Sequence, residues 1–115
     1  MSDIQTLIDK IKKFRDERDW KQFHNHKNMA ISLALEAAEV LEHFQWKNFE
    51  ECEEYGKTHK DEVAEELADV AIYLFELCDN LGIDLKEAMD KKLEKNAQKY
   101  PIEKARGRHT KYNKL

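Results

Sequence analysis

The sequence predicts an all-α protein, and three observations support this fold class. The 115 residues include one proline and three glycines, so few positions interrupt a helix. Alanine, leucine, glutamate and lysine, which favour helices, dominate the chain. Apolar residues recur at helical spacing in four segments, which predicts a four-helix bundle. With 41% hydrophobic and 38% charged residues, many surfaces of such a bundle must face water or a partner chain.

The first helix is expected over residues 3–19. Ser2 and Gln5 have the spacing of a capping box at its start. Its apolar stripe consists of Ile4, Leu7, Ile8, Ile11 and Phe14. Residues 20–27 then break the helical period but contain two aromatic and two histidine side chains, which is unusual for a solvated connection. We therefore expect residues 20–27 to line a site.

Two segments predict helices that are buried on several sides. Residues 28–46 lack glycine and proline and are apolar around most of the helical wheel. Residues 62–78 repeat this character, and the residues between them, 47–58, are polar and acidic. Each central helix is apolar on more sides than one small bundle can cover, so we expect packing across a subunit interface.

The fourth helix is expected to begin at Asp84, where Asp84 and Glu87 have the spacing of another capping box. It continues to about Lys99, because Tyr100 and Pro101 stop it. The length of the chain predicts one helical domain, residues 1–103, and a basic tail, residues 104–115.

The charge of the chain is unevenly distributed. The total is −4, but residues 104–115 hold five lysines and arginines and no acid, so the remainder carries −9. The simpler interpretation of the tail is a solvated, disordered terminus, and the alternative is an arm that contacts phosphate. The acidic body makes nucleic acid an unexpected partner.

The cysteine content and the N-terminus predict a cytoplasmic protein. Cys52 and Cys78 have neither the density of a disulfide scaffold nor the spacing of metal ligands, so free thiols are expected. The N-terminus lacks the apolar region of a signal peptide, and no segment approaches the roughly 18 apolar residues of a membrane span. No membrane partner is expected.

Four carboxylates are the main candidates for chemistry. Glu36 and Glu39 lie about 60° apart on the wheel of an apolar helix, and Glu66 and Asp69 have the same arrangement on the next buried helix. Burying such a cluster is unfavourable without a cation, because each charge loses water and repels the others. Oxygen ligands favour Mg²⁺, with Mn²⁺ as a substitute, and these ions commonly bind substrate phosphates.

Other interpretations of these acids remain open. One ExxE pair alone is more often solvated or paired with lysine, whereas two pairs on two apolar helices favour a metal site. A di-iron bundle needs Glu-x-x-His pairs, which the chain lacks, and His43 is expected to be a packing or interface histidine. In a non-enzymatic helical interaction module, the acids would be surface charge and residues 20–27 a partner-binding face.

Five segments carry a family resemblance over roughly residues 10–107: FRDERDWKQFHNHKN, LEAAEVLEHFQWK, EELADVAIYLFEL, GIDLKEAMDKKLEKNAQKYP and ARG. Their order resembles the MazG-like all-α NTP pyrophosphohydrolases, closest to the dCTP pyrophosphatase branch. The resemblance implies dNTP + H₂O → dNMP + PPi, with dCTP as the first candidate substrate and a role in cleaning the nucleotide pool. It also implies a dimer or tetramer with composite sites.

The resemblance also implies roles for individual residues. The metal motifs and the catalytic role fall on Glu36, Glu39, Glu66 and Asp69. The substrate-binding set comprises Trp20, His24 and Trp46 around the base, Tyr73 near the sugar, and Lys92, Asn96, Lys99 and Tyr100 at the phosphates or base. Many relatives have a doubled glutamate where this chain has Leu35 before Glu36, so one acid is absent. Metal binding is therefore better supported than the identity of the general base.

Overall fold

The computed structural model describes residues 3–115, so the expected cap Ser2 lies outside the described residues. The all-α prediction is confirmed, because no strand occurs in residues 3–115. The chain forms two compact units, Met1–Ile83 and Asp84–Leu115. Each unit is a group of packed helices, and this grouping does not test where the domain ends. The proposed extent of the domain, residues 1–103, therefore stays a prediction.

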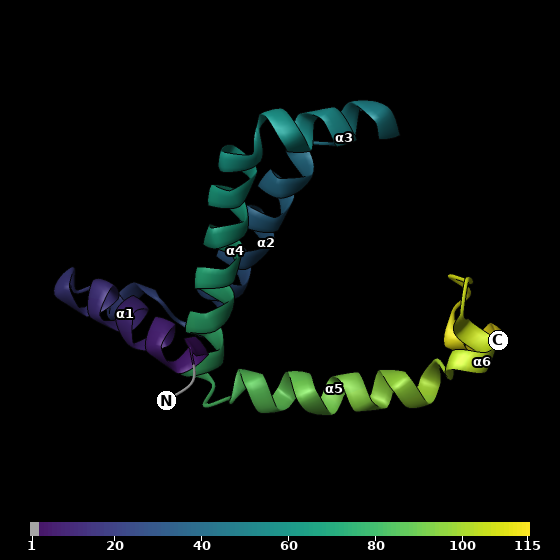
Figure 1. The fold of residues 1–115 in the computed structure, drawn as a ribbon. Coiled ribbons are helices and arrows are strands. Elements are labelled where there is room, and N and C mark those ends of the chain that lie inside the picture. Colours follow the sequence, from purple (N-terminus) through teal and green to yellow (C-terminus); the bar gives the residue numbers. More distant parts are fainter. Residues whose placement is uncertain (1–2) are drawn as a thin grey trace. The chain divides into compact units, whose positions relative to one another are not determined.

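Figure 1 shows the order of the helices along the chain. The first unit contains α1 (Asp3–Glu17), the short 3₁₀ helix η1 (Lys21–Phe23), α2 (His26–Glu42), α3 (Phe49–Thr58) and α4 (Lys60–Asn80). The second unit contains α5 (Leu85–Lys99), α6 (Ile102–Ala105) and the 3₁₀ helix η2 (Tyr112–Lys114).

The pair α2 and α4 forms the centre of the first unit, and the two helices lie side by side in Figure 1. They are antiparallel, because the residues just before α2 contact the end of α4. His24 bonds to Glu76, and the Asn80 amide donates to the His24 carbonyl at 2.9 Å. Met29, on the first turn of α2, is only 2% exposed. This antiparallel register decides which side chains of the two helices can meet.

The helix α1 packs against the C-terminal half of α4. Its apolar stripe buries Ile8, as the helical spacing predicts. Lys12 forms an ion pair with Asp79 at 3.9 Å, and Arg15 reaches Glu76 from the same side of α1. The stripe of α1 therefore combines apolar contacts with charges that pair across to α4.

The helix α3 was not predicted, because residues 47–58 had been interpreted only as polar and acidic. Its start carries a full capping box: the Asn48 side chain accepts from the Glu51 amide at 2.9 Å, and the Glu51 carboxylate accepts from the Asn48 amide at 3.2 Å. His43, at the end of α2, bonds the Tyr55 hydroxyl of α3 at 2.6 Å. His43 therefore has the packing role that its spacing suggested.

Replacing Asn48 with alanine is expected to lower the free energy of unfolding by about 1 kcal/mol, because the Glu51 amide loses its acceptor. Urea denaturation followed by circular dichroism measures this change. Asn48→Asp is the matched control, since aspartate keeps the acceptor and should preserve stability. An equal loss in both variants would show that the cap does not stabilise α3.

The second unit begins as the sequence predicts. The Asp84 side chain accepts from the Glu87 amide at 3.1 Å, and α5 ends at Lys99, before Pro101.

The basic tail differs from the expected disordered terminus, because the Tyr112 ring packs edge-on against Tyr100 with ring centroids 6.1 Å apart. The Lys99 amine lies 4.7 Å from the centre of the same Tyr112 ring. These aromatic contacts hold the tail against the end of α5.

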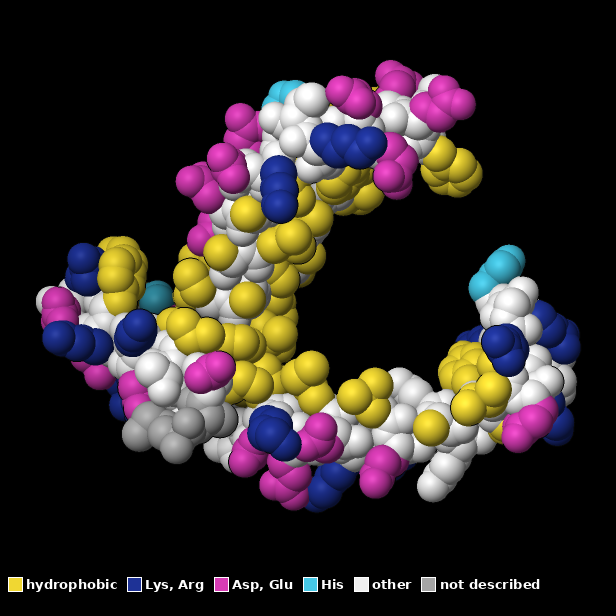
Figure 2. Space-filling view, in the orientation of Figure 1, with side chains coloured by type: hydrophobic (Ala, Val, Ile, Leu, Met, Phe, Trp, Pro, Cys, Tyr) yellow, Lys and Arg dark blue, Asp and Glu magenta, His cyan; other side chains and the backbone are white. Residues whose placement is uncertain are grey.

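The central helix pair exposes a large apolar surface, part of which is visible in Figure 2. On α2, Ile31, Leu35 and Leu41 are each about half exposed or more, and Leu67 on α4 is similar. Among residues 3–115, the buried hydrophobic side chains are Ile8, Met29 and Cys78. Both helices are therefore more apolar than their contacts within the first unit require.

No helix in the described residues is long and apolar enough to cross a membrane.

Candidate active site

Three of the four predicted metal ligands meet between α2 and α4. Side-chain oxygens of Glu36, Glu39 and Glu66 all lie within 4.8 Å of one another. Glu36 and Glu39 are one helical turn apart on α2, and the antiparallel register puts Glu66 of α4 opposite them. Local spacing and helix pairing together create this carboxylate cluster.

The cluster is electrostatically strained without a cation. Burial raises the pKa of Glu36 to about 7, helped by a hydrogen bond to Glu39 and by the charges of Glu39, Asp69 and Glu66. The pKa of Glu66 is also raised, first by its hydrogen bond with Glu39 and then by burial. One oxygen of Glu36 and one of Glu66 are buried without a hydrogen-bond partner. Such oxygens are costly unless a ligand satisfies them, and they suit a hard cation.

Asp69, the fourth predicted ligand, lies one turn beyond Glu66 on α4. The three-carboxylate group does not include it, but its charge contributes to the raised pKa values of Glu36 and Glu66. Its side chain also lines a pocket that extends along α4. Asp69 therefore connects the carboxylate cluster to that pocket.

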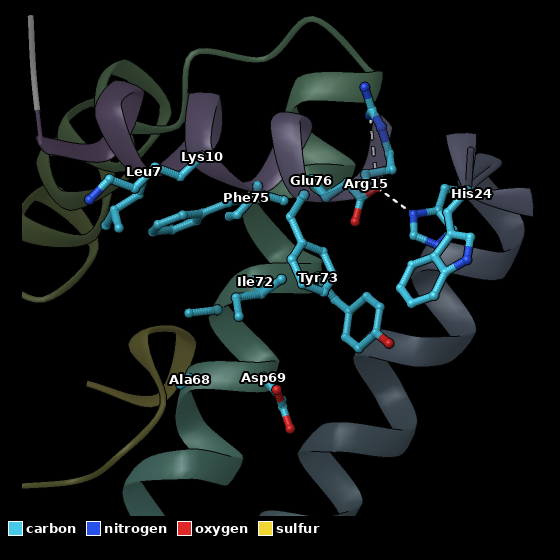
Figure 3. Close-up of a pocket in the computed structure, with 14 residues that line it drawn as sticks. Leu7, Lys10, Arg15, His24, Ala68, Asp69, Ile72, Tyr73, Phe75 and Glu76 are labelled. Atoms are coloured by element: carbon cyan, nitrogen blue, oxygen red, sulfur yellow. Dashed lines mark hydrogen bonds and ion pairs between the residues drawn. The ribbon is translucent and has the colours of Figure 1, made fainter. Parts of the chain in front are cut away.

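The pocket lies between α1, the segment around η1 and α4, and its volume is about 550 Å³ (Figure 3). This volume falls in the range of roughly 300–1,000 Å³ typical of small-molecule sites. Trp20 and His24 line one side, with ring centroids 6.1 Å apart. Phe14 contacts Trp20 edge-on at 5.8 Å. Of residues 20–27, Trp20 and His24 therefore line a concave site, and aromatic rings form one of its sides.

Tyr73 lies midway along the pocket, one turn after Asp69 on α4. Burial raises the pKa of its hydroxyl, and the negative charges of Glu36, Asp69 and Glu76 add to this effect. Tyr73 therefore remains a neutral hydrogen-bonding group at physiological pH, between the carboxylates at one end of the pocket and Glu76 at the other.

Sequence reasoning did not identify the charged network at the far end of the pocket. Glu76 and Arg15 are only 3% and 2% exposed, and the Arg15 Nη1 atom lies 3.8 Å from the Glu76 carboxylate. The His24 Nδ1 atom lies 2.5 Å from the same Glu76 oxygen. A signal was present, because Arg15 follows Ile8 by seven residues and Glu76 follows Asp69 by seven. Both charges therefore fall on faces that point into the unit.

The structure does not bring all predicted substrate-binding residues together within the first unit. Trp46 follows α2, whereas Trp20 and His24 precede it. The 17 residues of α2 separate these positions by about 25 Å. Trp46 is 88% exposed, so it is free to contact another chain. The four remaining predicted residues belong to the second unit: Lys92, Asn96, Lys99 and Tyr100.

Comparison with known proteins assigns the chain to a family. A profile of the MazG-like family matches residues 31–115, which include all four carboxylates. The chain belongs to the MazG-like family. The resemblance noted in the sequence is therefore confirmed.

Two curated relatives are longer than this chain. The mouse (Mus musculus) dCTP pyrophosphatase 1 is 40% identical over 104 residues, and the human (Homo sapiens) dCTP pyrophosphatase 1 is 39% identical over 104 residues. Each alignment covers 89% of this chain and 61% of the relative. The chain thus spans about three fifths of the length of these relatives.

A solved structure supports the MazG-like fold directly. The crystal structure of a pyrophosphatase from Archaeoglobus fulgidus superposes with a TM-score of 0.83 at 45% sequence identity. The match covers 88% of this chain and 94% of that protein. The all-α fold and its helix order are therefore those of a pyrophosphatase of known structure.

Proposed function

We propose that this protein is a Mg²⁺-dependent nucleoside triphosphate pyrophosphohydrolase that converts a dNTP and water to a dNMP and pyrophosphate. One observation carries the proposal: two buried, unpaired carboxylate oxygens lie beside a pocket of nucleotide size. The relatives named dCTP pyrophosphatase 1 support both the reaction and dCTP as the first substrate to test. The cellular role is then removal of unwanted nucleotides, and a cytoplasmic location stays a prediction.

The carboxylates of Glu36, Glu39 and Glu66 lie close enough together to hold a divalent cation, and Asp69, one turn after Glu66 on α4, is the fourth ligand in this proposal. Glu36 and Glu66 each offer a buried oxygen without a partner, and an all-oxygen set suits Mg²⁺ or Mn²⁺. A bound Mg²⁺ would neutralise phosphate charge and promote attack of water on the α-phosphorus. We expect a nearby carboxylate to accept the proton of that water.

The pocket residues bind and orient the nucleotide in this proposal. Asp69 lies at the end of the pocket nearest the carboxylates, so the phosphates occupy that end. Tyr73 lies beside the sugar, one helical turn further along α4. The rings of Trp20 and His24 stack against the base and exclude water from it.

Trp46 is the predicted residue of the first unit that lies away from the pocket, and a second copy of the chain would supply it. Trp46 lies at the opposite end of α2 from the pocket, and α2 and α4 expose an apolar face that includes Leu35 and Leu67. We propose that a homo-oligomer, a dimer or a dimer of dimers, covers this face and brings Trp46 to a neighbouring pocket. In this proposal, contacts to the phosphates and base also come from four residues of the second unit: Lys92, Asn96, Lys99 and Tyr100.

A substrate panel tests the reaction. Purified protein with Mg²⁺ is expected to release pyrophosphate, and no orthophosphate, from at least one of the canonical deoxynucleoside triphosphates, and EDTA should abolish the release. Orthophosphate as the only product would contradict attack at the α-phosphorus. Absence of both products, together with melting temperatures that Mg²⁺ does not change, would instead favour a non-enzymatic interaction module.

A further inference from the structure

The charged network of Arg15, Glu76 and His24 is an unusual structure for the end of an apolar pocket. Glu76 is 3% exposed and Arg15 2% exposed, so both charges have lost nearly all contact with water. The same Glu76 oxygen lies 3.8 Å from the Arg15 Nη1 atom and 2.5 Å from the His24 Nδ1 atom. Burying these charges is costly, and the Arg15 Nη1 atom makes no hydrogen bond, so Arg15 is held by its ion pair with Glu76 and by the hydrogen bond that its Nε donates to the Asp16 carboxylate at 2.9 Å.

The second Glu76 oxygen has no hydrogen-bond partner within residues 3–115, although Glu76 lines the pocket. Figure 3 shows the Glu76 carboxylate between Tyr73 and Arg15, with one oxygen turned away from the His24 ring. The Asn80 amide donates to the His24 carbonyl at 2.9 Å, which fixes the backbone beside the network. A preorganised acceptor is therefore available to a ligand in the pocket.

The position of Glu76 along α4 decides which part of a nucleotide it meets. Asp69, Tyr73 and Glu76 are spaced i, i+4 and i+7 on one face of α4, and the seven residues from Asp69 to Glu76 span about 10 Å. This inference rests on the proposed function, in which the phosphates occupy the Asp69 end. The base then points its edge farthest from the sugar at Glu76.

We propose that Glu76 is a specificity-determining residue that selects bases carrying an amino group at the position farthest from the sugar. An ionised carboxylate accepts hydrogen bonds and donates none. Cytosine has an amino group at this position and adenine has one at the equivalent position, and carboxylates accept from such groups. Uracil, thymine and guanine have a carbonyl oxygen there, which Glu76 repels. Arg15 and His24 are positioning residues that hold the carboxylate in place.

The nucleotide pair dCTP and dUTP tests this proposal, because the two bases differ in the amino or carbonyl group that meets Glu76. We expect kcat/KM for pyrophosphate release to be at least about 10-fold higher for dCTP than for dUTP. Glu76→Gln should bring the ratio within about threefold of one, since an amide can donate as well as accept. The ratio compares two substrates on one preparation, so partial unfolding of the variant cancels.

Asp79→Asn is the matched control. Asp79 lies on the same helix and pairs with Lys12 of α1 but does not line the pocket, so its substitution should preserve the dCTP to dUTP ratio. A wild-type ratio near one, or a ratio that Glu76→Gln leaves unchanged, would overturn the role of Glu76 while pyrophosphate release still upholds the proposed function.

Calorimetry with nucleoside monophosphates separates the two proposals. We expect dCMP to bind the wild-type protein at least about 10-fold more tightly than dUMP and to lose this advantage in Glu76→Gln. If no triphosphate releases pyrophosphate, the proposed function fails, and preferential binding of dCMP still supports the selection by Glu76. Equal binding of dCMP and dUMP to the wild-type protein overturns that selection.

Discussion

Replacing Glu36 with glutamine is expected to stabilise the metal-free protein while reducing Mg²⁺-dependent pyrophosphate release by at least about 100-fold. The loss of activity follows because a bound cation contributes several kcal/mol to charge stabilisation and each 1.36 kcal/mol changes the rate about tenfold. The gain in stability follows because glutamine removes a charge from a cluster in which Glu36, Glu39 and Glu66 lie within 4.8 Å of one another. Pyrophosphate release and thermal melting measure the two effects.

The contribution of Glu36 to the stability of the metal-free protein is expected to depend on pH. The pKa of Glu36 rises from an ordinary value of 4.5 to about 7 in the folded chain, so folding favours the protonated form. The contribution of Glu36 to stability is therefore fully present below pH 4.5 and is lost as the pH rises to about 7. Glu36→Gln should remove this part of the pH dependence.

Magnesium should reverse the trend in the wild-type protein, because a cation binds the ionised carboxylates and displaces the proton. Stabilisation by Mg²⁺ is then expected to grow from pH 5 to pH 8 in the wild type and to be small in Glu36→Gln. Glu53→Gln on α3, an exposed acid outside the cluster, serves as control and should behave as wild type. Equal stabilisation of Glu36→Gln and wild type by Mg²⁺ would exclude Glu36 as a ligand.

Replacing Arg15 with methionine is expected to destabilise the protein by about 3–5 kcal/mol, because it leaves the buried Glu76 carboxylate without its cation. The double variant Arg15→Met/Glu76→Leu should recover most of this loss, since an apolar pair of similar volume avoids burying a charge. Urea unfolding of the wild type, both single variants and the double variant measures the coupling.

Arg18→Met provides the comparison on the same helix. The Arg18 guanidinium lies 3.7 Å from the centre of the Phe14 ring, and its side chain is exposed, so about 1 kcal/mol or less should be lost. If Arg15→Met costs no more than Arg18→Met, or if the losses at positions 15 and 76 simply add, the buried ion pair does not support the packing of α1 on α4.

Features that depend on neighbouring residues were determined by the sequence itself. Helical spacing predicted α1, α2, α4 and α5, and the Asp84 cap marked the start of α5, because these signals lie within one or two turns. The same locality placed Glu36 with Glu39 on one face. The capping box of Asn48 and Glu51 was equally local, and α3 was overlooked because its composition is polar and acidic.

Only the tertiary structure decided which of these faces meet. The contact of His24 with Glu76 joins residues 52 positions apart, and it exists because α2 and α4 pair in one antiparallel register. That register also puts Glu66 opposite Glu36 and sends Trp46 to the far end of α2, which no spacing within one helix reveals. The sequence alone determined which residues carry charge on apolar helices. The packing of α1 and α2 on α4 decided which of those charges form the carboxylate cluster and which face the pocket.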